Sequence, residues 1–250
     1  MSEFSVVIPA RLASQRLPGK PLVEIVGKTM IERVYAQATG SRAAEVIVAT
    51  DSPEIEAVCR EAGARVEMTA SDHASGTDRI AEVADRLAWP EDRIVVNVQG
   101  DEPLIPPALI DQVASLLDAD PAAAMATLMT PLAHDDEYRD PHMVKVVTDN
   151  TGSAIYFSRA PIPWDTAEGV PDDARRHIGL YAYRVGALRR IAAAPVAPPE
   201  RAERLEQLRA LWLGLRIAVA DAVEEPPRGV DTEEDLEFIR ELVRVRKQGT

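Results

Sequence analysis

Three cationic side chains lie in one short segment near the start of the chain. Arg11, Arg16 and Lys20 fall within residues 9–21, PARLASQRLPGKP, which shows no apolar periodicity. Cations this close repel one another unless an anion lies between them, and a polyphosphate would satisfy them through forked arginine hydrogen bonds and the point charge of lysine. Most basic loops are solvated turns. The position directly after the first expected strand nevertheless favours phosphate binding.

Acidic residues follow an apolar run farther along the chain. Asp101 and Glu102 come directly after VNVQG, and Asp231 stands in a second turn, GVDT, before the last expected helix. Mg²⁺ prefers oxygen ligands and often takes only one or two carboxylates together with substrate phosphates. The pattern indicates a magnesium position, although Gly-Asp pairs are also common in exposed turns. Thr232 and Asp235 are expected to cap the last helix, which leaves Asp231 to point elsewhere.

Other familiar motifs are incomplete. Residues 27–29, GKT, resemble the end of a phosphate-binding P-loop, but Leu22 stands where that motif needs glycine. The first loop has only Gly19, which argues against a dinucleotide fingerprint, and no G-x-S-x-G elbow indicates a hydrolase. Cys59 is the only cysteine, so a disulfide framework and a cysteine-based zinc site are excluded.

The elements that must position these residues alternate between strand and helix over the first 120 residues. Alternation of this kind predicts an α/β fold with a mostly parallel sheet covered on both faces. Because the two aspartates are distant in sequence, the last helix must dock against the end of the fourth strand to complete the metal site. Strands are predicted at 4–10, 46–49, 66–69 and 94–98, and helices at 29–39, 53–63, 75–87 and 106–117.

The pattern changes after residue 120, where strand candidates follow one another with less helix between them. This favours an inserted region with antiparallel pairing at about 124–200, inside a single domain that spans 1–250. Residues from about 201 to 250 are then expected to return and complete the active site. Strands are predicted at 124–130, 144–148, 154–158, 179–183 and 217–219, and helices at 205–213 and 232–245.

Composition limits the classes of partner. The 250 residues are 46% hydrophobic and 28% charged, which is typical of an ordinary globular protein. A net charge of −13 argues against binding to nucleic acid or to an anionic membrane surface through an overall basic face. No apolar run approaches the ~18 residues of a membrane helix, and no signal peptide is recognised at the N-terminus, so the expected location is the cytoplasm.

Ordered segments over the whole chain support a family resemblance. They are IPARLASQRLPGKPL at 8–22, VATD at 48–51, DHASGTDR at 72–79, VNVQGDEP at 96–103, VKVV at 144–147, YFSRAPIPW at 156–164, RHIGLYAYR at 176–184, LEQLR at 205–209 and GVDT at 229–232. Together they resemble the CMP-Kdo synthetase family, the 3-deoxy-manno-octulosonate (Kdo) cytidylyltransferases. One of these motifs alone would not be specific.

The resemblance implies a Rossmann-like nucleotidyltransferase fold with an inserted dimerisation subdomain, and transfer of CMP from CTP to an acidic acceptor with Mg²⁺ and release of pyrophosphate. It implies catalytic roles for Lys20, Arg11 and Asp101, and metal binding by Asp101 and Asp231. The implied nucleotide-binding residues are Ala10, Arg11, Ser14, Lys20, Ser75 and Gly76. The implied acceptor-binding residues are Arg16, Gln99, Arg159, His177, Tyr181, Glu206 and Gln207.

Two features concern the acceptor and the assembly. The stretch 164–175 is poor in basic residues, and APPE at 197–200 replaces the commoner SPLE. Kdo or a close sugar acid is the first expectation for the acceptor, and phosphonoformate, used by a related branch, is the alternative. A homodimer is expected through the 124–200 region, because the apolar residues at 155–157 would otherwise leave an exposed sheet edge.

Overall fold

The computed structural model describes residues 2–13, 17–132, 134–166 and 169–248. It divides into two compact units, which we name by their place in the chain. The N-terminal unit comprises residues 3–89, 95–111 and 226–250, and the middle unit comprises residues 1–2, 90–94 and 112–225. The predicted inserted region of about 124–200 falls within the middle unit, whereas residues 201–250 are divided between the two.

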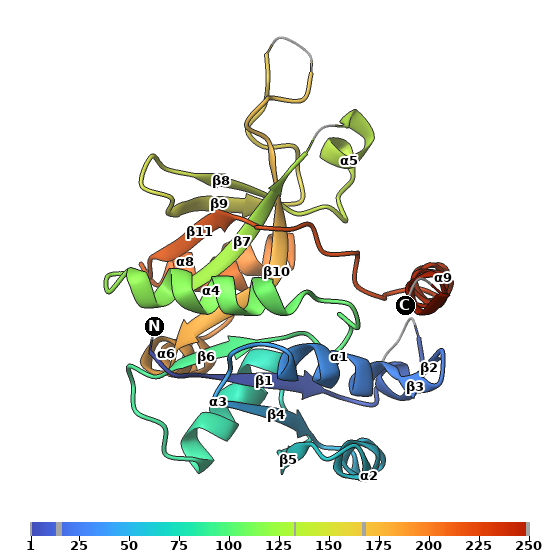
Figure 1. Ribbon diagram of the computed structural model, residues 1–250. Helices are drawn as coiled ribbons and strands as arrows, with labels where there is room; N and C mark the ends of the chain where they lie inside the picture. The colour runs from blue at the N-terminus through green and yellow to red at the C-terminus, as the bar shows by residue number, and fades with distance from the viewer. Residues whose placement is uncertain (1, 14–16, 133, 167–168, 249–250) are drawn as a thin grey trace. The chain divides into compact units, whose positions relative to one another are not determined.

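Strands and helices alternate along the N-terminal unit, as the pattern predicts (Figure 1). In chain order its elements are β1 (Phe4–Ala10), η1 (Lys20–Leu22), β2 (Glu24–Ile25), β3 (Lys28–Thr29), α1 (Met30–Thr39), β4 (Glu45–Thr50), α2 (Pro53–Glu61), β5 (Arg65–Met68), α3 (Gly76–Arg86), β6 (Ile94–Asn97) and α9 (Glu233–Gln248), and α4 (Pro107–Ala119) begins in this unit.

The sheet of this unit has the strand order β6-β1-β4-β5. β1 pairs with β4 and β4 with β5, both in parallel. The backbone N–H of Val98 donates to Val7 O at 3.2 Å. The central strands are buried along nearly their whole length, which explains why they appear in the sequence as continuous β-branched runs rather than as alternating patterns.

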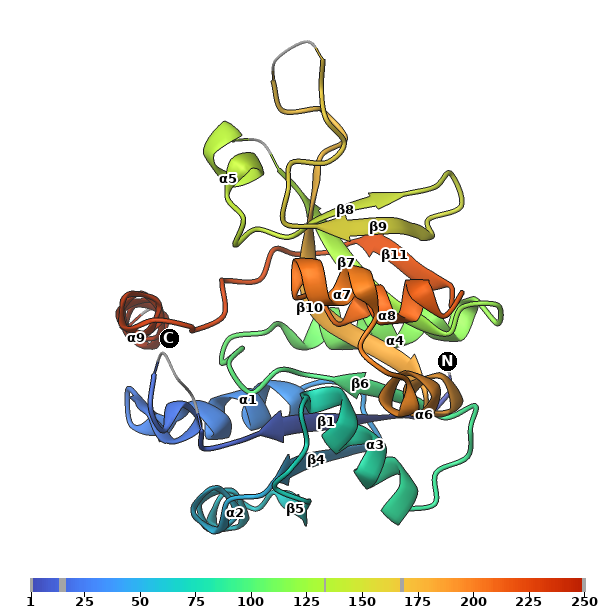
Figure 2. The same cartoon turned by 180° about the vertical axis from the view of Figure 1, so that it is seen from behind.

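Helices cover both faces of this sheet because the chain reverses its direction across it. The crossovers β1–α1–β4 and β4–α2–β5 lead outward, and α3 then returns the chain from β5 to β6. Right-handed crossovers in opposite directions place their helices on opposite faces. Figure 2 shows α3 lying across β1 and β4.

Three helices begin at capping residues, and for the last of them the sequence predicts the cap. The Ser52 side chain accepts from Ile55 N ahead of Pro53, and Ser75 opens α3 with a capping box. Before α9, Asp235 N donates to Thr232 Oγ1 at 3.2 Å while Thr232 N donates to Asp235 Oδ2 at 2.8 Å. These bonds satisfy backbone donors that the first turn of a helix would leave unpaired.

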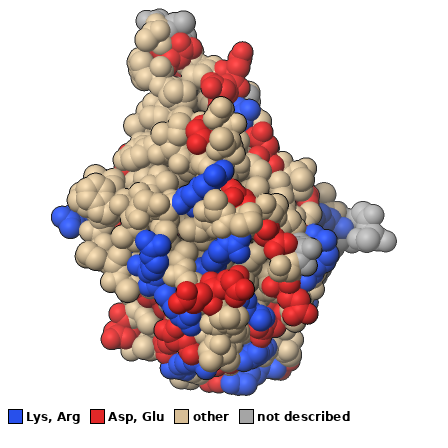
Figure 3. All heavy atoms as spheres, turned by 90° about the vertical axis from the view of Figure 1, so that its left-hand side faces the viewer, with Lys and Arg blue, Asp and Glu red and all other residues tan. Residues whose placement is uncertain are grey.

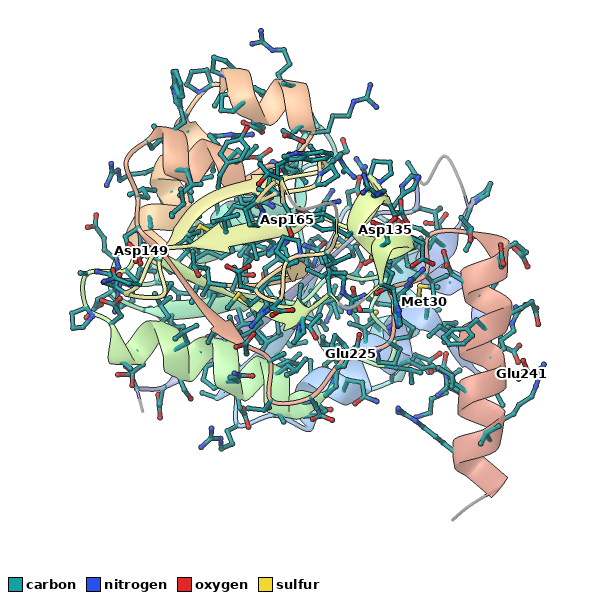
Figure 4. All side chains as sticks on the ribbon, turned by 90° about the horizontal axis from the view of Figure 1, so that it is seen from above. Met30, Asp135, Asp149, Asp165, Glu225 and Glu241 are labelled. Carbon is teal, nitrogen blue, oxygen red and sulfur yellow. The ribbon has the colours of Figure 1, made fainter. Side chains whose placement is uncertain are left out.

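A separate apolar cluster joins α9 to the segment around η1 and the β2–β3 hairpin. Ile239 is fully buried in it, and Arg240 donates to Glu24 O at 2.9 and 3.1 Å. Figure 4 shows Met30 beside α9 and Glu241 pointing outward from the helix. The buried members of the cluster are Leu17, Ile25, Met30, Leu104, Val230, Leu236, Ile239 and Val243.

The middle unit contains the antiparallel pairing that was predicted. β10 runs antiparallel to β7 and β8 antiparallel to β9, whereas β11 runs parallel to β7. The complete elements are β7 (Met125–Pro131), α5 (Asp135–Arg139), β8 (Lys145–Thr148), β9 (Ala154–Ser158), β10 (Arg175–Arg184), α6 (Val185–Ala193), α7 (Pro198–Glu203), α8 (Gln207–Trp212) and β11 (Ile217–Asp221).

Several boundaries differ from the predictions. β10 begins at Arg175 rather than at residue 179, and its register shifts between Ile178 and Tyr181, where Gly179 interrupts the pattern. A five-residue helix, α5, replaces the surface turn expected at 134–136, and its Tyr138 is buried. The helix predicted at 205–213 is only the six-residue α8, and α6 was not predicted.

Two further observations concern the surface and the single thiol. None of the helices in the described part of the chain is long and apolar enough to cross a membrane. Figure 3 shows Lys and Arg side chains interspersed with Asp and Glu side chains on one face. Cys59 is buried on α2, and desolvation, with a smaller contribution from Glu32, raises the pKa of its thiol to about 12.

Candidate active site

The residues expected to bind a nucleotide gather at the carboxyl end of β1. A side chain at Gly76, in the first turn of α3, would meet Pro9 Cγ at 3.1 Å, and one at Gly100 would meet Pro9 O at 3.0 Å. A side chain at either position would require Pro9 to shift by a few tenths of an ångström, so glycine suits this close approach. The close approach brings Ala10, at the end of β1, near the start of α3 and near the segment that holds Asp101.

Lys20 connects two aspartates that are distant in sequence. Its Nζ donates to Asp101 Oδ2 at 2.7 Å and to Asp231 Oδ1 at 3.0 Å. The two carboxylates therefore converge on a single cation, as the sequence indicates for the metal site. Glu102, the neighbour of Asp101, is not a partner in these two contacts.

The backbone around this contact explains why the three side chains meet. Gly19 has φ of +65°, a left-handed conformation that reverses the chain into η1 and presents Lys20. Val230 N donates to Asp101 O at 2.9 Å, which ties the turn before α9 to the segment that follows β6. A side chain at Gly229 would meet Glu102 Oε1 at 2.9 Å and Asp101 O at 3.3 Å, so this turn lies close against the segment that holds the two acidic residues. The predicted docking of the last helix against the end of the fourth predicted strand, which is β6, is therefore confirmed.

The donor set fits magnesium. Two carboxylate oxygens within hydrogen-bonding distance of one ammonium group are hard ligands that can face one small cation. Mg²⁺ commonly takes one or two carboxylates and completes its shell with water and phosphate oxygens. Among the residues that the structure describes, no group of three or more His, Cys, Asp or Glu side chains could hold a metal by itself. The phosphates of a substrate would have to supply the other ligands.

Two further nucleotide candidates are accessible to a ligand. Arg11 is exposed in the loop that follows β1. The Ser75 hydroxyl accepts from Asp78 N at 3.2 Å, while Asp78 Oδ2 accepts from Ser75 N at 3.0 Å. Ser75 therefore keeps its hydroxyl proton available for a base carbonyl or another acceptor. Ser14 and Arg16 lie outside the described residues.

His177 is a buried, neutral imidazole in the middle unit. Desolvation, with a smaller effect of Arg176, lowers the pKa of His177 to about 3. Its ring lies 4.9 Å from that of Phe157, edge to face, and 5.3 Å from that of Tyr181. At neutral pH it therefore carries no charge for an acceptor carboxylate, a role that the sequence had left open for it, and this pKa makes it a poor general base.

The hydrogen bonds of Thr127 assign the tautomer of His177. Thr127 Oγ1 lies 3.0 and 2.8 Å from the carbonyls of Ile178 and Leu180, and 2.9 Å from His177 Nε2. Since neither carbonyl can donate, the single hydroxyl proton goes to one of them, and Oγ1 accepts from His177 Nε2–H. The Nδ1 atom is then the unprotonated ring nitrogen.

The other acceptor candidates of the middle unit lie around β9, α7 and α8. Arg159 Nε donates to Glu203 O and its Nη1 to Pro141 O, both at 2.8 Å, so part of its guanidinium is already engaged. Gln207 is buried at the start of α8 and Glu206 precedes it. Burial raises the pKa of Tyr181 well above its usual range. Gln99, the remaining candidate, belongs to the N-terminal unit and is half-buried.

Three buried charged residues near these candidates were missed by sequence reasoning. Lys145, fully buried in β8, donates through Nζ to the carbonyls of Asp140, Met143 and Arg159. Glu200 and Arg209 form a buried ion pair at 2.5 Å that ties α7 to α8. Two features of the sequence could have indicated buried charges: the lysine inside the apolar run VKVV and the arginine at the end of LEQLR. A sequence pattern does not show, however, which group pairs with a buried charge.

Comparison with known proteins decides the family. The family model described as Cytidylyltransferase matches residues 5–217. The chain belongs to the cytidylyltransferase family. It is accordingly a CTP-dependent nucleotidyltransferase, and the expectation drawn from the sequence motifs is confirmed.

Similar proteins from the cytidylyltransferase family match almost the whole chain. A protein of Halorhodospira halophila named 3-deoxy-manno-octulosonate cytidylyltransferase is 54% identical over 244 residues, covering 94% of this chain and 95% of its own. A protein of Pseudomonas syringae with the same name is 53% identical, covering 96% and 98%.

Solved structures agree with the nucleotidyltransferase fold. A CMP:2-keto-3-deoxy-manno-octonic acid synthetase complexed with CTP superposes with a TM-score of 0.91 at 41% identity, covering 98% of this chain and all of that one. A cytidylyltransferase from Leptospira borgpetersenii, at 16% identity and a TM-score of 0.64, covers all of this chain and 95% of its own and shares the fold alone.

Proposed function

We propose that this chain transfers CMP from CTP to the sugar acid 3-deoxy-manno-octulosonate and releases pyrophosphate. The observation that carries the proposal is the 53–54% identity, over nearly the full chain, to proteins named for this reaction. The alternative acceptor, phosphonoformate, gains no support from these names. The convergence of Lys20, Asp101 and Asp231 supplies the charges that such a transfer needs.

The N-terminal unit is proposed to bind the triphosphate. A hydroxyl oxygen of the acceptor attacks the α-phosphorus and releases its proton to solvent, a new P–O bond forms, and the bond to the bridging oxygen breaks so that pyrophosphate leaves. Charge grows on the phosphoryl oxygens and on the leaving group, and prepositioned cations stabilise it. Arg11 and Lys20 are the proposed cations, with Ser14 as a further phosphate contact. Asp101 and Asp231 are the proposed ligands of Mg²⁺, which would neutralise developing charge when bound.

The cytosine base of CTP is proposed to bind near the start of α3. Ala10 and Gly76 lie beside Pro9, and Ser75 has a hydroxyl proton to donate. Cytosine differs from uracil in its exocyclic amine and in the protonation of N3, so backbone carbonyls there would discriminate between the two bases. A buried hydrogen-bond acceptor that the wrong base leaves unpaired strongly disfavours binding of that nucleotide.

The acceptor is proposed to use Arg16, Gln99, Arg159, His177, Tyr181, Glu206 and Gln207. Since His177 is neutral, the carboxylate of the acceptor has to find its cation among the arginines, while the amides of Gln99 and Gln207 suit hydroxyl groups. A homodimer through the middle unit and a cytoplasmic location, where CTP is available, complete the proposal.

The test is pyrophosphate release by the purified protein with Mg²⁺ and a matrix of nucleotides and acceptors. We expect release with CTP and Kdo, and at least about 10²-fold less with UTP and Kdo because of the unpaired acceptor. Phosphonoformate with CTP provides the competing arm, and CTP without acceptor provides the background. Release with phosphonoformate but not with Kdo would refute the proposed acceptor, and equal rates with UTP would refute the proposed base selection.

A further inference from the structure

The contact between Lys20 and the two aspartates has a consequence for metal binding. Both short distances, 2.7 Å to Asp101 and 3.0 Å to Asp231, end on the same ammonium group. That group therefore already neutralises part of the charge that would attract a divalent ion. The same carboxylate oxygens cannot face the ammonium and a metal at full strength, because two cations at one pair of oxygens repel each other.

The lysine is better covered than the carboxylates that it holds. Its side chain is 12% exposed, against 36% for Asp101 and 47% for Asp231. An ion from solvent can therefore approach both carboxylates from their exposed side, whereas the ammonium contacts them from the covered side. Gly19 and buried Pro21, on either side of Lys20, set the backbone that keeps it there.

We propose that Lys20 is an internal counter-ion that holds the position between the aspartates until the nucleotide arrives, so that the metal binds tightly only together with CTP. The inference rests on the proposed use of Asp101 and Asp231 as magnesium ligands. A triphosphate offers the displaced ammonium new anionic partners, which a free metal ion does not. Binding of CTP thus removes the repulsion that opposes the metal.

Lysine suits this exchange of partners better than arginine does. Its ammonium is a compact point charge with three donors on a flexible four-carbon stem, so it can leave one oxygen and meet another without matching a plane. A guanidinium would hold a carboxylate through two parallel bonds, and its release would break both at once.

The test measures metal affinity without turnover. Free Mn²⁺ is followed by electron paramagnetic resonance with the full-length protein, with and without CTP, and with no acceptor present. We expect Lys20→Met to bind Mn²⁺ alone at least about tenfold more tightly than the wild type does, because the competing cation is gone. In the wild type, CTP should raise Mn²⁺ affinity strongly, and in Lys20→Met this gain should be smaller.

Lys28→Met is the matched control, because it removes the same charge from an exposed lysine of the same unit, on β3. It should leave Mn²⁺ affinity within about twofold of the wild type. The double variant Lys20→Met/Asp231→Asn should lose the gain in Mn²⁺ affinity that Lys20→Met shows. This loss would locate the bound ion at the aspartates. Circular dichroism checks folding, and Lys20→Gln, which keeps a donor for the carboxylates, gives a second comparison.

The outcomes separate this inference from the proposed function. If the wild type binds Mn²⁺ as tightly without CTP as with it, or if neither neutral variant gains affinity, Lys20 is not a counter-ion and the inference is wrong. If the wild type fails to bind Mn²⁺ even with CTP, the proposed metal ligands themselves are wrong, and the inference falls with them.

Discussion

At the scale of single residues, the site is defined by charges that the fold brings together. The residue types and motifs predict roles for Lys20, Asp101 and Asp231, and the structure places the lysine in contact with both aspartates. Their positions at element ends made this predictable. The neutrality of His177 was not predictable, because it depends on its burial against Phe157 and Tyr181 and, to a smaller extent, on the charge of Arg176.

Removal of one carboxylate tests the proposed metal site. Asp101→Asn keeps the shape of the side chain but removes the charge, so the metal loses a ligand and Lys20 loses a partner. Metal stabilisation of the transition state contributes several kcal/mol, so turnover should fall on the order of 10³-fold. Pyrophosphate release under saturating CTP and Kdo measures the effect. An unchanged melting temperature would show that the fold survives, and near-normal turnover would contradict the assignment.

The buried imidazole predicts a pH dependence of stability. The pKa of His177 in the folded protein, about 3, lies below the usual 6.5, so the unfolded chain takes up the proton first as pH falls. The contribution of His177 to stability is therefore fully present above pH 6.5 and is lost as pH falls towards 3. The difference in unfolding free energy between the wild type and His177→Gln should decline by about 2 kcal/mol from pH 7 to pH 5.

Urea unfolding at several pH values provides that measurement. His142→Gln is the control, because His142 is exposed and folding leaves its ring in water. Both variants are compared with the wild type over the same pH range. A constant difference for His177→Gln would mean that the imidazole is protonated without cost in the folded protein.

At the scale of elements, caps and apolar runs predicted most of the N-terminal unit. Ser52, Ser75 and Thr232 each open a helix where the sequence indicated one. The β2–β3 hairpin was not predicted, because Val26 turns there at a φ of +49°, a conformation that a β-branched residue rarely adopts and that local propensity does not indicate. The β10 strand was predicted too short, since its first residues are Arg-Arg-His and pairing with both β7 and β8 makes them extended.

The docking of α9 should depend on its buried face. Ile239 is fully buried in the cluster that also contains Leu17 and Val230. These two residues are close in sequence to Lys20 and Asp231, respectively. Ile239→Ala should lower the free energy of unfolding by about 2–5 kcal/mol, because it leaves a cavity there. Urea denaturation measures the change. Glu241→Ala, on the exposed side of the same helix, should change stability by less than about 0.5 kcal/mol, and equal effects of the two would argue against this packing.

At the scale of the whole molecule, the exposed apolar residues of β9 predict an assembly. Among the described residues, β9 forms its ladder with β8, and only Ser153, directly before it, bridges to Ala218 of β11. The strand exposes 58% of Ile155 and 37% of Tyr156 while Phe157 is buried. A partner that covers this strand would bury apolar surface and complete the edge. We expect light scattering at micromolar concentration to give the mass of two chains, and Ile155→Asp to shift it towards one.

Phe238→Asp is the control for that experiment, because it also places a charge at an exposed apolar position but lies on α9. It should leave the dimer intact. A wild-type mass of one chain would contradict the proposed assembly.

Sequence alone predicted the fold class and the family, since many ordered motifs agree, but the limits of the two compact units depend on contacts that no local pattern contains.

The covered thiol of Cys59 makes this chain convenient for site-specific labelling. With a pKa of about 12 and almost no exposed surface, the thiol forms a negligible fraction of thiolate near neutral pH, and it is the thiolate that attacks maleimide reagents. No cysteine would have to be removed before a dye is attached, since the chain has only this one. A fluorophore introduced through Glu241→Cys would then label a single position on α9 and report, by its anisotropy, when that helix leaves its neighbours.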